Sequence, residues 1–136
     1  MNLNDQIPIS RFEYKKLIVS VYSNSIWRVF VKPDAFLDIE DIKQVLDFSN
    51  ALGPKMYLNL FEFSKHASID ESVRKWASDP EGNKRTIADA IVFNGLDQQL
   101  IADFYVKFNS PIKPTKLFSN LDEAVNWLLS FSVKES

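Results

Sequence analysis

Two spacings of apolar residues alternate along this chain: short, dense runs that are typical of buried strands, and positions three or four residues apart that are typical of helices. Five dense runs predict strands, over Leu17–Tyr22, Ile26–Val31, Met56–Phe63, Ile87–Phe93 and Thr115–Phe118. The first two runs are separated only by Ser23-Asn24-Ser25, which predicts a hairpin. Met56–Phe63 is apolar at almost every position, as expected of a central strand in a parallel sheet that is covered on both faces.

Helices are predicted where capping residues precede apolar positions at helical spacing. Asp38 can cap a first helix that Gly53 and Pro54 end, because glycine adopts the left-handed cap and proline cannot continue a helix. Ser68-Ile69-Asp70-Glu71 matches the S-x-x-E capping box and predicts a second helix over Asp70–Ser78.

Two further helices are predicted toward the C-terminus. Asn94 and Asp97 bracket the start of a helix that extends to about Asn109, and Asn120 with Glu123 opens the last one. The order of elements is therefore β-β-α-β-α-β-α-β-α. This order predicts an α/β fold with a mostly parallel five-stranded sheet, an antiparallel edge strand and helices packed on the sheet.

Length and composition indicate one soluble domain. The chain has 136 residues, of which 46% are hydrophobic, so we expect a single domain over residues 1–136 with an ordered core from about 12 to 131. Sixteen basic and eighteen acidic side chains give a net charge of −2, which disfavours a nucleic-acid partner.

The same composition excludes several kinds of chemistry. The absence of cysteine excludes disulfides, thiolate nucleophiles and Fe–S clusters. The first residues lack the pattern of a signal peptide and no apolar run has the length of a membrane span, so we expect a cytoplasmic protein without membrane insertion. The three glycines form no phosphate-binding loop, so we expect no nucleotide cofactor. Asp, Glu and His residues do not stand at the spacing of metal ligands, so we expect no cofactor of another kind and no metal. Lys107, Lys113 and Lys116 are expected to be solvated surface.

The predicted order, together with LNLFEFSKHASIDESV at the third strand, resembles the STAS domain, which is the SpoIIAA-like fold of the anti-sigma-factor antagonists. The resemblance covers residues 12 to 131. In that family an Asp-Ser-Ser/Thr-Gly motif starts the helix after the third strand, and phosphorylation of a serine there releases a protein partner. This chain has Asp70 and Ser72 at two of these positions, with Glu71 and Val73 at the others. The resemblance therefore implies Ser72 as a phosphoacceptor, with an ordinary first-turn serine as the alternative.

A second likeness lies near the C-terminus. The residues PIKPTKLF, from Pro111 to Phe118, are similar to a Pro-x-x-Pro-Thr-x-Leu-Phe segment of small uncharacterised bacterial proteins that have the same fold. This likeness implies kinship of fold and no particular activity.

The leading hypothesis is a non-enzymatic module that binds a protein partner through the loop Ser64–Ile69 and the helix after it. A loop at the carboxyl end of a central strand is where open α/β sheets usually bind ligands. The partner-binding candidates are Ser64, Lys65, His66, Ser68, Asp70, Glu71, Ser72 and Trp76. An exposed Trp76 would mark an interface. A homodimer is also considered, because two-fold pairing is the commonest assembly.

Two other classes of function stay open. Trp27, Trp76 and Trp127 could line the cavity of a carrier of a lipid or small apolar ligand, although such residues usually form core. His66 is the single histidine and could serve a small hydrolase together with a loop serine or carboxylate. No G-x-S-x-G motif accompanies it.

Overall fold

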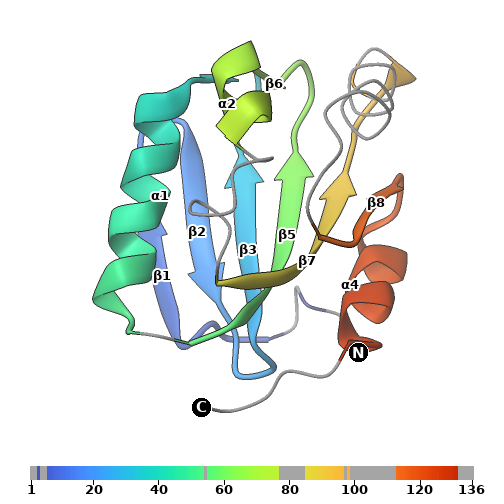
Figure 1. The fold of residues 1–136 in the computed structure, drawn as a ribbon. Helices are drawn as coiled ribbons and strands as arrows, with labels where there is room; N and C mark the ends of the chain where they lie inside the picture. The colour runs from blue at the N-terminus through green and yellow to red at the C-terminus, as the bar shows by residue number, and fades with distance from the viewer. Residues whose placement is uncertain are drawn as a thin grey trace.

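A six-stranded sheet forms the centre of the molecule (Figure 1). The computed structural model describes residues 3, 6–53, 55–76, 85–96, 98 and 113–131. The strands lie in the order β1-β2-β3-β5-β7-β8. Their bounds are Ser10–Glu13 for β1, Leu17–Val21 for β2, Ile26–Val31 for β3, Tyr57–Phe63 for β5, Thr86–Val92 for β7 and Thr115–Phe118 for β8.

The sheet is antiparallel at one edge and parallel elsewhere. β1 pairs with β2 and β2 with β3 in antiparallel fashion, whereas β3, β5, β7 and β8 run parallel to one another. The predicted hairpin is confirmed as β2 and β3, and β5 is the predicted central strand. The predicted number of five strands is wrong, because β1 was missed. Three of the four side chains of β1 are exposed, so this edge strand has no dense apolar run.

A second, two-stranded sheet lies above the carboxyl end of the main one. β4 (Phe36–Leu37) and β6 (Ser68–Ile69) pair in parallel, with Phe36 opposite Ser68. Because Ser68 belongs to a strand, the capping box predicted from Ser68 and Glu71 does not form. Asp70 takes the capping role instead, since its Oδ2 accepts the Ser72 backbone N–H at 3.1 Å.

The helix starts at Asp38 and Asn120 follow the sequence predictions. α1 (Ile39–Ala51) begins at Asp38, whose side chain accepts the Asp41 backbone N–H while the Asp41 side chain accepts the Asp38 backbone N–H. Gly53 follows the helix with a φ of 94°, which is the left-handed conformation that glycine adopts without strain. α4 (Leu121–Leu129) begins at Asn120, which accepts the Glu123 backbone N–H.

The two predicted middle helices are described only in part. α2 spans Glu71–Trp76, and the last two residues of the predicted Asp70–Ser78 lie outside the described residues. The helix predicted to reach Asn109 falls mostly outside the described residues. None of the described helices combines the length and apolarity that a membrane crossing requires.

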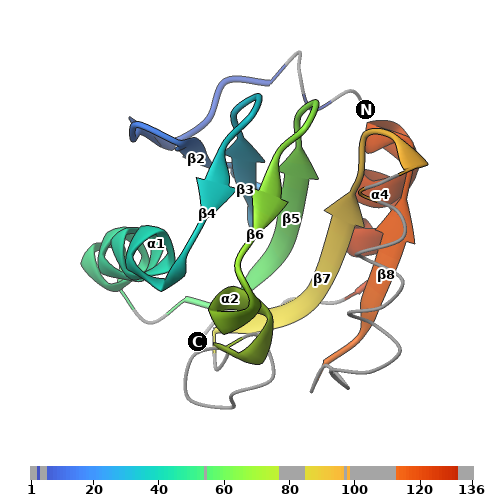
Figure 2. The ribbon, with the colours of Figure 1, turned by 90° about the horizontal axis from the view of Figure 1, so that it is seen from above.

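Helices cover both faces of the sheet. Figure 2 shows α1 and α2 on one side and α4 on the other. Successive side chains of a strand point to opposite faces, so β3 sends Trp27 and Val29 toward α1 and Ile26 toward the α4 side. Leu58 and Leu60 of β5 pack with Ala124, Val125 and Leu128 of α4 into one apolar cluster. Trp27, Val29 and Tyr57 pack with Val45 of α1 into the other cluster.

Candidate functional site

The loop after β5 is held in place by backbone hydrogen bonds. The Ala67 N–H donates to Ser64 O at 3.1 Å, which closes a turn, and His66 inside it has a φ of 62°. Gln98 donates from Nε2 to the carbonyls of Ser64 and Ala67, at 2.7 Å each. Lys65 and His66 are exposed, so the turn presents two side chains on a fixed backbone.

The start of α2 is built around Asp70. The Ser72 hydroxyl donates to Asp70 Oδ2 at 2.5 Å, and the same oxygen accepts the Ser72 backbone N–H. Ser72 is half-buried, whereas Glu71 is exposed and lies 3.9 Å from Lys75 Nζ. The Ser72 hydroxyl therefore donates a hydrogen bond to the carboxylate that caps α2. Phosphorylation of Ser72 would place a phosphate against the Asp70 carboxylate and would break this hydrogen bond.

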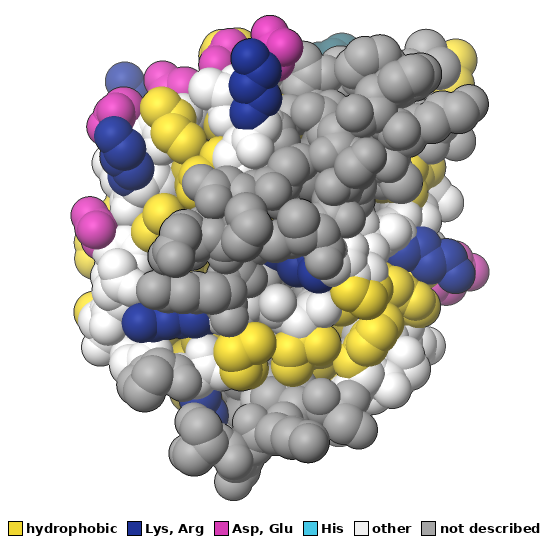
Figure 3. Space-filling model, in the orientation of Figure 1, with side chains coloured by type: hydrophobic (Ala, Val, Ile, Leu, Met, Phe, Trp, Pro, Cys, Tyr) yellow, Lys and Arg dark blue, Asp and Glu magenta, His cyan; other side chains and the backbone are white. Residues whose placement is uncertain are grey.

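Two exposed apolar side chains flank the turn that carries His66. Phe36 is 51% exposed and lies in β4, in register with Ser68. Leu96 is 70% exposed and stands two residues before Gln98, which holds the turn. In Figure 3, acidic and basic side chains also lie side by side over α1 and α2. We call Phe36, Lys65, His66 and Leu96 the carboxyl-edge surface.

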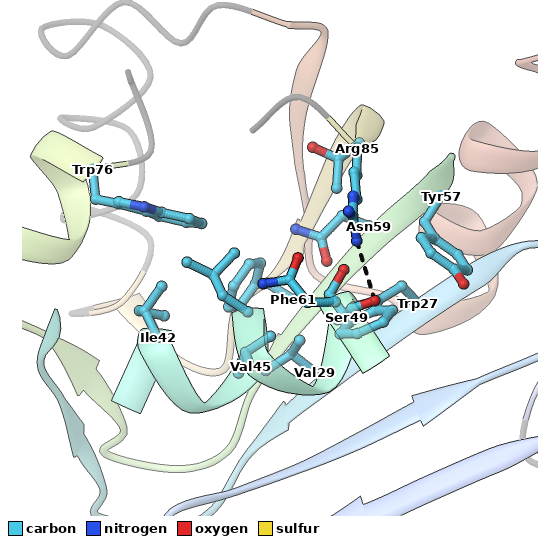
Figure 4. Close-up of a pocket in the computed structure, with 13 residues that line it drawn as sticks. Trp27, Val29, Ile42, Val45, Ser49, Tyr57, Asn59, Phe61, Trp76 and Arg85 are labelled. Atoms are coloured by element: carbon cyan, nitrogen blue, oxygen red, sulfur yellow. Dashed lines mark hydrogen bonds between the residues drawn. The ribbon is translucent and has the colours of Figure 1, made fainter. Parts of the chain in front are cut away.

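Trp76, one of the partner-binding candidates, is not part of the carboxyl-edge surface. Its side chain is half-buried and lines a cavity between α1, α2 and the sheet. Figure 4 shows the indole pointing from α2 into this cavity. Trp27 lines the same cavity, but Trp127 packs with Phe118 and Phe131 on the opposite side of the sheet. Two of the three tryptophans considered for a ligand cavity are therefore brought together.

The cavity is partly open and has a volume of about 250 Å³. Its apolar wall consists of Trp27, Val29, Ile42, Val45, Leu46, Tyr57, Phe61 and Trp76. Its polar wall consists of Ser49, Asn50, Asn59, Arg85 and Thr86. Figure 4 places Arg85 and Asn59 across the cavity from Trp76, with Trp27 and Tyr57 on their side.

A buried polar network continues from this polar wall into the sheet. Asn59 and Asp89 are register neighbours on β5 and β7, and Asn59 Nδ2 donates to Asp89 Oδ1 at 3.0 Å. Lys113 Nζ lies 3.3 Å from Asp89 Oδ1 and also donates to the Thr86 hydroxyl. Burial raises the pKa of the Asp89 carboxyl, and burial lowers the pKa of the Lys113 ammonium, while each partner opposes the shift of the other.

Arg85 belongs to the polar wall and is half-buried. Its Nη1 donates to the carbonyl oxygens of Ser49 at 3.3 Å and Gly53 at 3.2 Å, at the end of α1. These carbonyls carry the negative end of the helix dipole. Among the residues that the structure describes, no carboxylate forms an ion pair with the Arg85 guanidinium.

Sequence reasoning missed four residues of this region, namely Asn59, Arg85, Asp89 and Lys113. The expectation that Lys113 is solvated was wrong, because its side chain is only 7% exposed. Lys116 is exposed, and Lys107 lies outside the described residues. A signal was present in the strands, since Asn59 and Asp89 interrupt two runs that are otherwise almost entirely apolar. No local signal marks Lys113, which stands between Ile112 and Pro114 in the sequence.

The residues considered for hydrolysis are close in sequence but are not joined into a catalytic set. Within the described part of the chain, no hydrogen bond or ion pair links His66 to Ser64, Ser68 or Asp70. A Ser/His/Asp triad needs such links, although they are often looser without substrate. The same described ranges contain no cluster of three or more His, Asp or Glu residues that could hold a metal ion.

Comparisons with known proteins bear on the fold. A family model described as Domain of unknown function (DUF7793) matches residues 20–132. No curated protein matches the chain. Among solved structures, the chain is similar to an uncharacterised protein of the DUF3478 family from Shewanella loihica PV-4, which is described as having a SpoIIAA-like fold. The identity is 14%, the match covers 93% of this chain and 99% of that one, and the TM-score is 0.56. This similarity confirms the predicted SpoIIAA-like fold.

Proposed function

The chain belongs to the family described as Domain of unknown function (DUF7793), and we propose that it is a non-enzymatic SpoIIAA-like module that binds a protein partner through its carboxyl-edge surface. We treat residues 1–136 as a single module of this kind, acting in the cytoplasm. The lack of cysteine fits a reducing compartment. The binding residues are Phe36, Lys65, His66 and Leu96, with Ser64, Ser68, Asp70, Glu71 and Ser72 as their support.

One observation carries this proposal. Phe36 and Leu96 are exposed apolar side chains on either side of a turn whose backbone is held by Gln98. Exposed apolar residues beside polar ones on a rigid backbone are typical of the centre of a binding surface. The turn needs little ordering on binding, which favours affinity because less conformational entropy is lost.

The proposal is tested by capture from a lysate of the source cells with two matched variants. Phe36→Asp and Phe12→Asp change side chains of equal exposure, 51% each, at the carboxyl edge and on β1. We expect one stoichiometric protein to bind the wild type and the Phe12→Asp variant but not Phe36→Asp. The captured protein, once purified, should bind the purified wild type in solution without any other component. Leu96→Asp should weaken this binding.

Circular dichroism on each variant establishes that the fold survives. Equal capture by wild type and Phe36→Asp would contradict the proposal. A native mass that shows a homodimer, disrupted by Phe36→Asp, would show instead that this surface joins two copies of the chain.

A further inference from the structure

The cavity beneath Trp76 has the size and walls of a small-molecule site. Its volume of about 250 Å³ exceeds the roughly 150 Å³ that holds benzene in a buried apolar cavity. It is smaller than most sites for drug-sized ligands, which begin near 300 Å³. The aromatic rings of Trp27, Phe61 and Trp76 and the branched side chains of α1 surround an occupant of that size with apolar contacts. The cavity is too small for a long lipid chain.

Asn59 supplies a polar group that lacks a partner. The residue is only 7% exposed and lines the cavity, and its Oδ1 makes no hydrogen bond. Its Nδ2 donates to Asp89, so the amide is oriented with the oxygen left over. A buried acceptor without a donor is costly, and each such group in a folded protein needs an explanation. A hydrogen-bond donor on a bound molecule would satisfy it.

The second polar group is the Arg85 guanidinium, which lines the same end of the cavity. Its Nη1 contacts are to backbone carbonyls, and in the described ranges it has no carboxylate partner. Guanidinium groups bind carboxylates through paired hydrogen bonds. The cavity therefore offers a cation for an anionic group beside an acceptor for a donor.

The buried charges near the cavity determine which hydrogen-bond donor of a ligand can approach the Asn59 oxygen. Lys113 is bonded to Thr86, which lines the cavity, so a second ammonium placed there would be repelled. Asp89 is already paired with Lys113 at 3.3 Å. A neutral hydroxyl on the ligand meets the Asn59 oxygen without this repulsion.

We propose that this cavity binds a small α-hydroxy acid whose side chain is aromatic or branched aliphatic. The apolar side chain packs between Trp27, Phe61 and Trp76. The hydroxyl donates to Asn59 Oδ1, and the carboxylate pairs with Arg85. This site is separate from the carboxyl-edge surface, and either can exist without the other.

The proposal is tested by calorimetric titration of the whole chain with phenyllactate and hydroxyisocaproate, together with analogues that lack one group. We expect at least one of these two acids to bind with a one-to-one stoichiometry. Hydrocinnamate, which lacks the hydroxyl, should bind about 3- to 10-fold more weakly than phenyllactate. Phenyllactamide, which lacks the charge, should bind about 10- to 100-fold more weakly. Phenylalanine, with an ammonium in place of the hydroxyl, should also bind more weakly.

Two variants locate the site, with a matched control. Arg85→Gln should remove the preference for phenyllactate over phenyllactamide, whereas Arg11→Gln, at a side chain that is 51% exposed, should keep it. A merely structural role of Arg85 would weaken both ligands together and leave their ratio unchanged. Val45→Phe should fill the cavity and abolish binding, and Arg85→Gln carries the test if this variant does not fold.

Three results would overturn the proposal. They are the failure of both acids to bind at millimolar concentration, an unchanged acid-to-amide ratio in Arg85→Gln, and binding of phenylalanine as tight as that of phenyllactate. Equal partner capture by the wild type and Phe36→Asp, with the acids still bound, would refute the carboxyl-edge surface alone.

Discussion

The two faces of the central sheet are packed in different ways. Under α4, the side chains of Leu58, Leu60 and Ala90 meet those of Val125 and Leu128, and each of these five is at most 2% exposed. Under α1 and α2, the sheet carries Asn59 and Asp89 among its apolar residues, and a cavity of about 250 Å³ separates it from Trp76. One face is closed and apolar, whereas the other is partly open and contains buried polar groups.

The closed face under α4 mainly stabilises the fold, whereas the face under α1 and α2 has the cavity and polar groups that a binding site needs. Close packing of apolar side chains contributes most of the folding free energy and leaves no room for a ligand. Buried polar groups and a cavity lower stability, so their presence on one face indicates a functional demand there. Both the cavity and the carboxyl-edge surface involve α2 or the segments next to it, and α4 contributes to neither.

The largest expected effect comes from the buried ion pair of the α1 face. Lys113→Met leaves the Asp89 carboxylate buried without its cation, and we expect it to lower the free energy of unfolding by about 3–5 kcal/mol. Adding Asp89→Leu should recover much of this loss. The matched control is Arg28→Met, because Arg28 and Glu62 pair at 2.6 Å with side chains 15% and 17% exposed, against 7% and 8% for Lys113 and Asp89. Urea denaturation of the wild type and the three variants gives each change in the free energy of unfolding. A larger loss for Arg28→Met than for Lys113→Met would contradict the prediction.

The second effect compares one valine on each face. Val125 of α4 is 2% exposed in the closed cluster, whereas Val45 of α1 lines the cavity. Val125→Leu should overpack its surroundings and lower the stability by about 1–3 kcal/mol. Val45→Leu should extend into empty space and raise the stability by about 0.5–2 kcal/mol. Thermal unfolding of both variants tests the contrast, which is broken if the two substitutions have effects of the same sign.

The smallest effect concerns the caps of the two helices. Asp38, at the start of α1, has a lowered pKa, first because the Asp41 backbone N–H donates to its side chain. Asn120, at the start of α4, does not titrate. A carboxyl with a lowered pKa in the folded state adds stability above its unfolded pKa of about 3.8, and loses it as the pH falls through the folded pKa.

We therefore expect the loss caused by Asp38→Ala to be largest above pH 3.8 and to vanish at lower pH. The loss caused by Asn120→Ala, about 0.5–2 kcal/mol, should stay constant over the same range. Denaturation curves at a series of pH values give both differences. A pH-independent loss for Asp38→Ala would exclude the capping carboxylate as its source.

Much of the fold could be read from local patterns. Each of the five predicted strand runs overlaps a strand of the main sheet, and the caps at Asp38 and Asn120 lie where their sequence contexts indicated. β1, β4 and β6 were missed because an exposed edge strand and two-residue strands leave no run of apolar residues. Ser68 and Glu71 have the spacing of a capping box, but the pairing of Ser68 with Phe36 prevents it.

The candidate sites were predicted less completely. The loop after the central strand was identified, yet its apolar flanks, Phe36 and Leu96, come from two other segments. Trp76 was considered both as a partner contact and as a residue lining a ligand cavity, and it lines a cavity together with Trp27. Asn59 and Asp89 could have been marked as polar residues within apolar runs, whereas no rule of spacing singles out Arg85 or Lys113.

The sequence by itself determined the alternation of strands and helices, because hydrophobic periodicity and helix caps act over a few residues. Only the tertiary structure decided where Asn59 meets Asp89, thirty residues further along the chain, and which lysine is drawn into the sheet beside them. It also decided that Trp76 and Arg85 face one cavity. Such contacts depend on strand register and on how two layers pack, and neither is encoded in any single stretch of the chain.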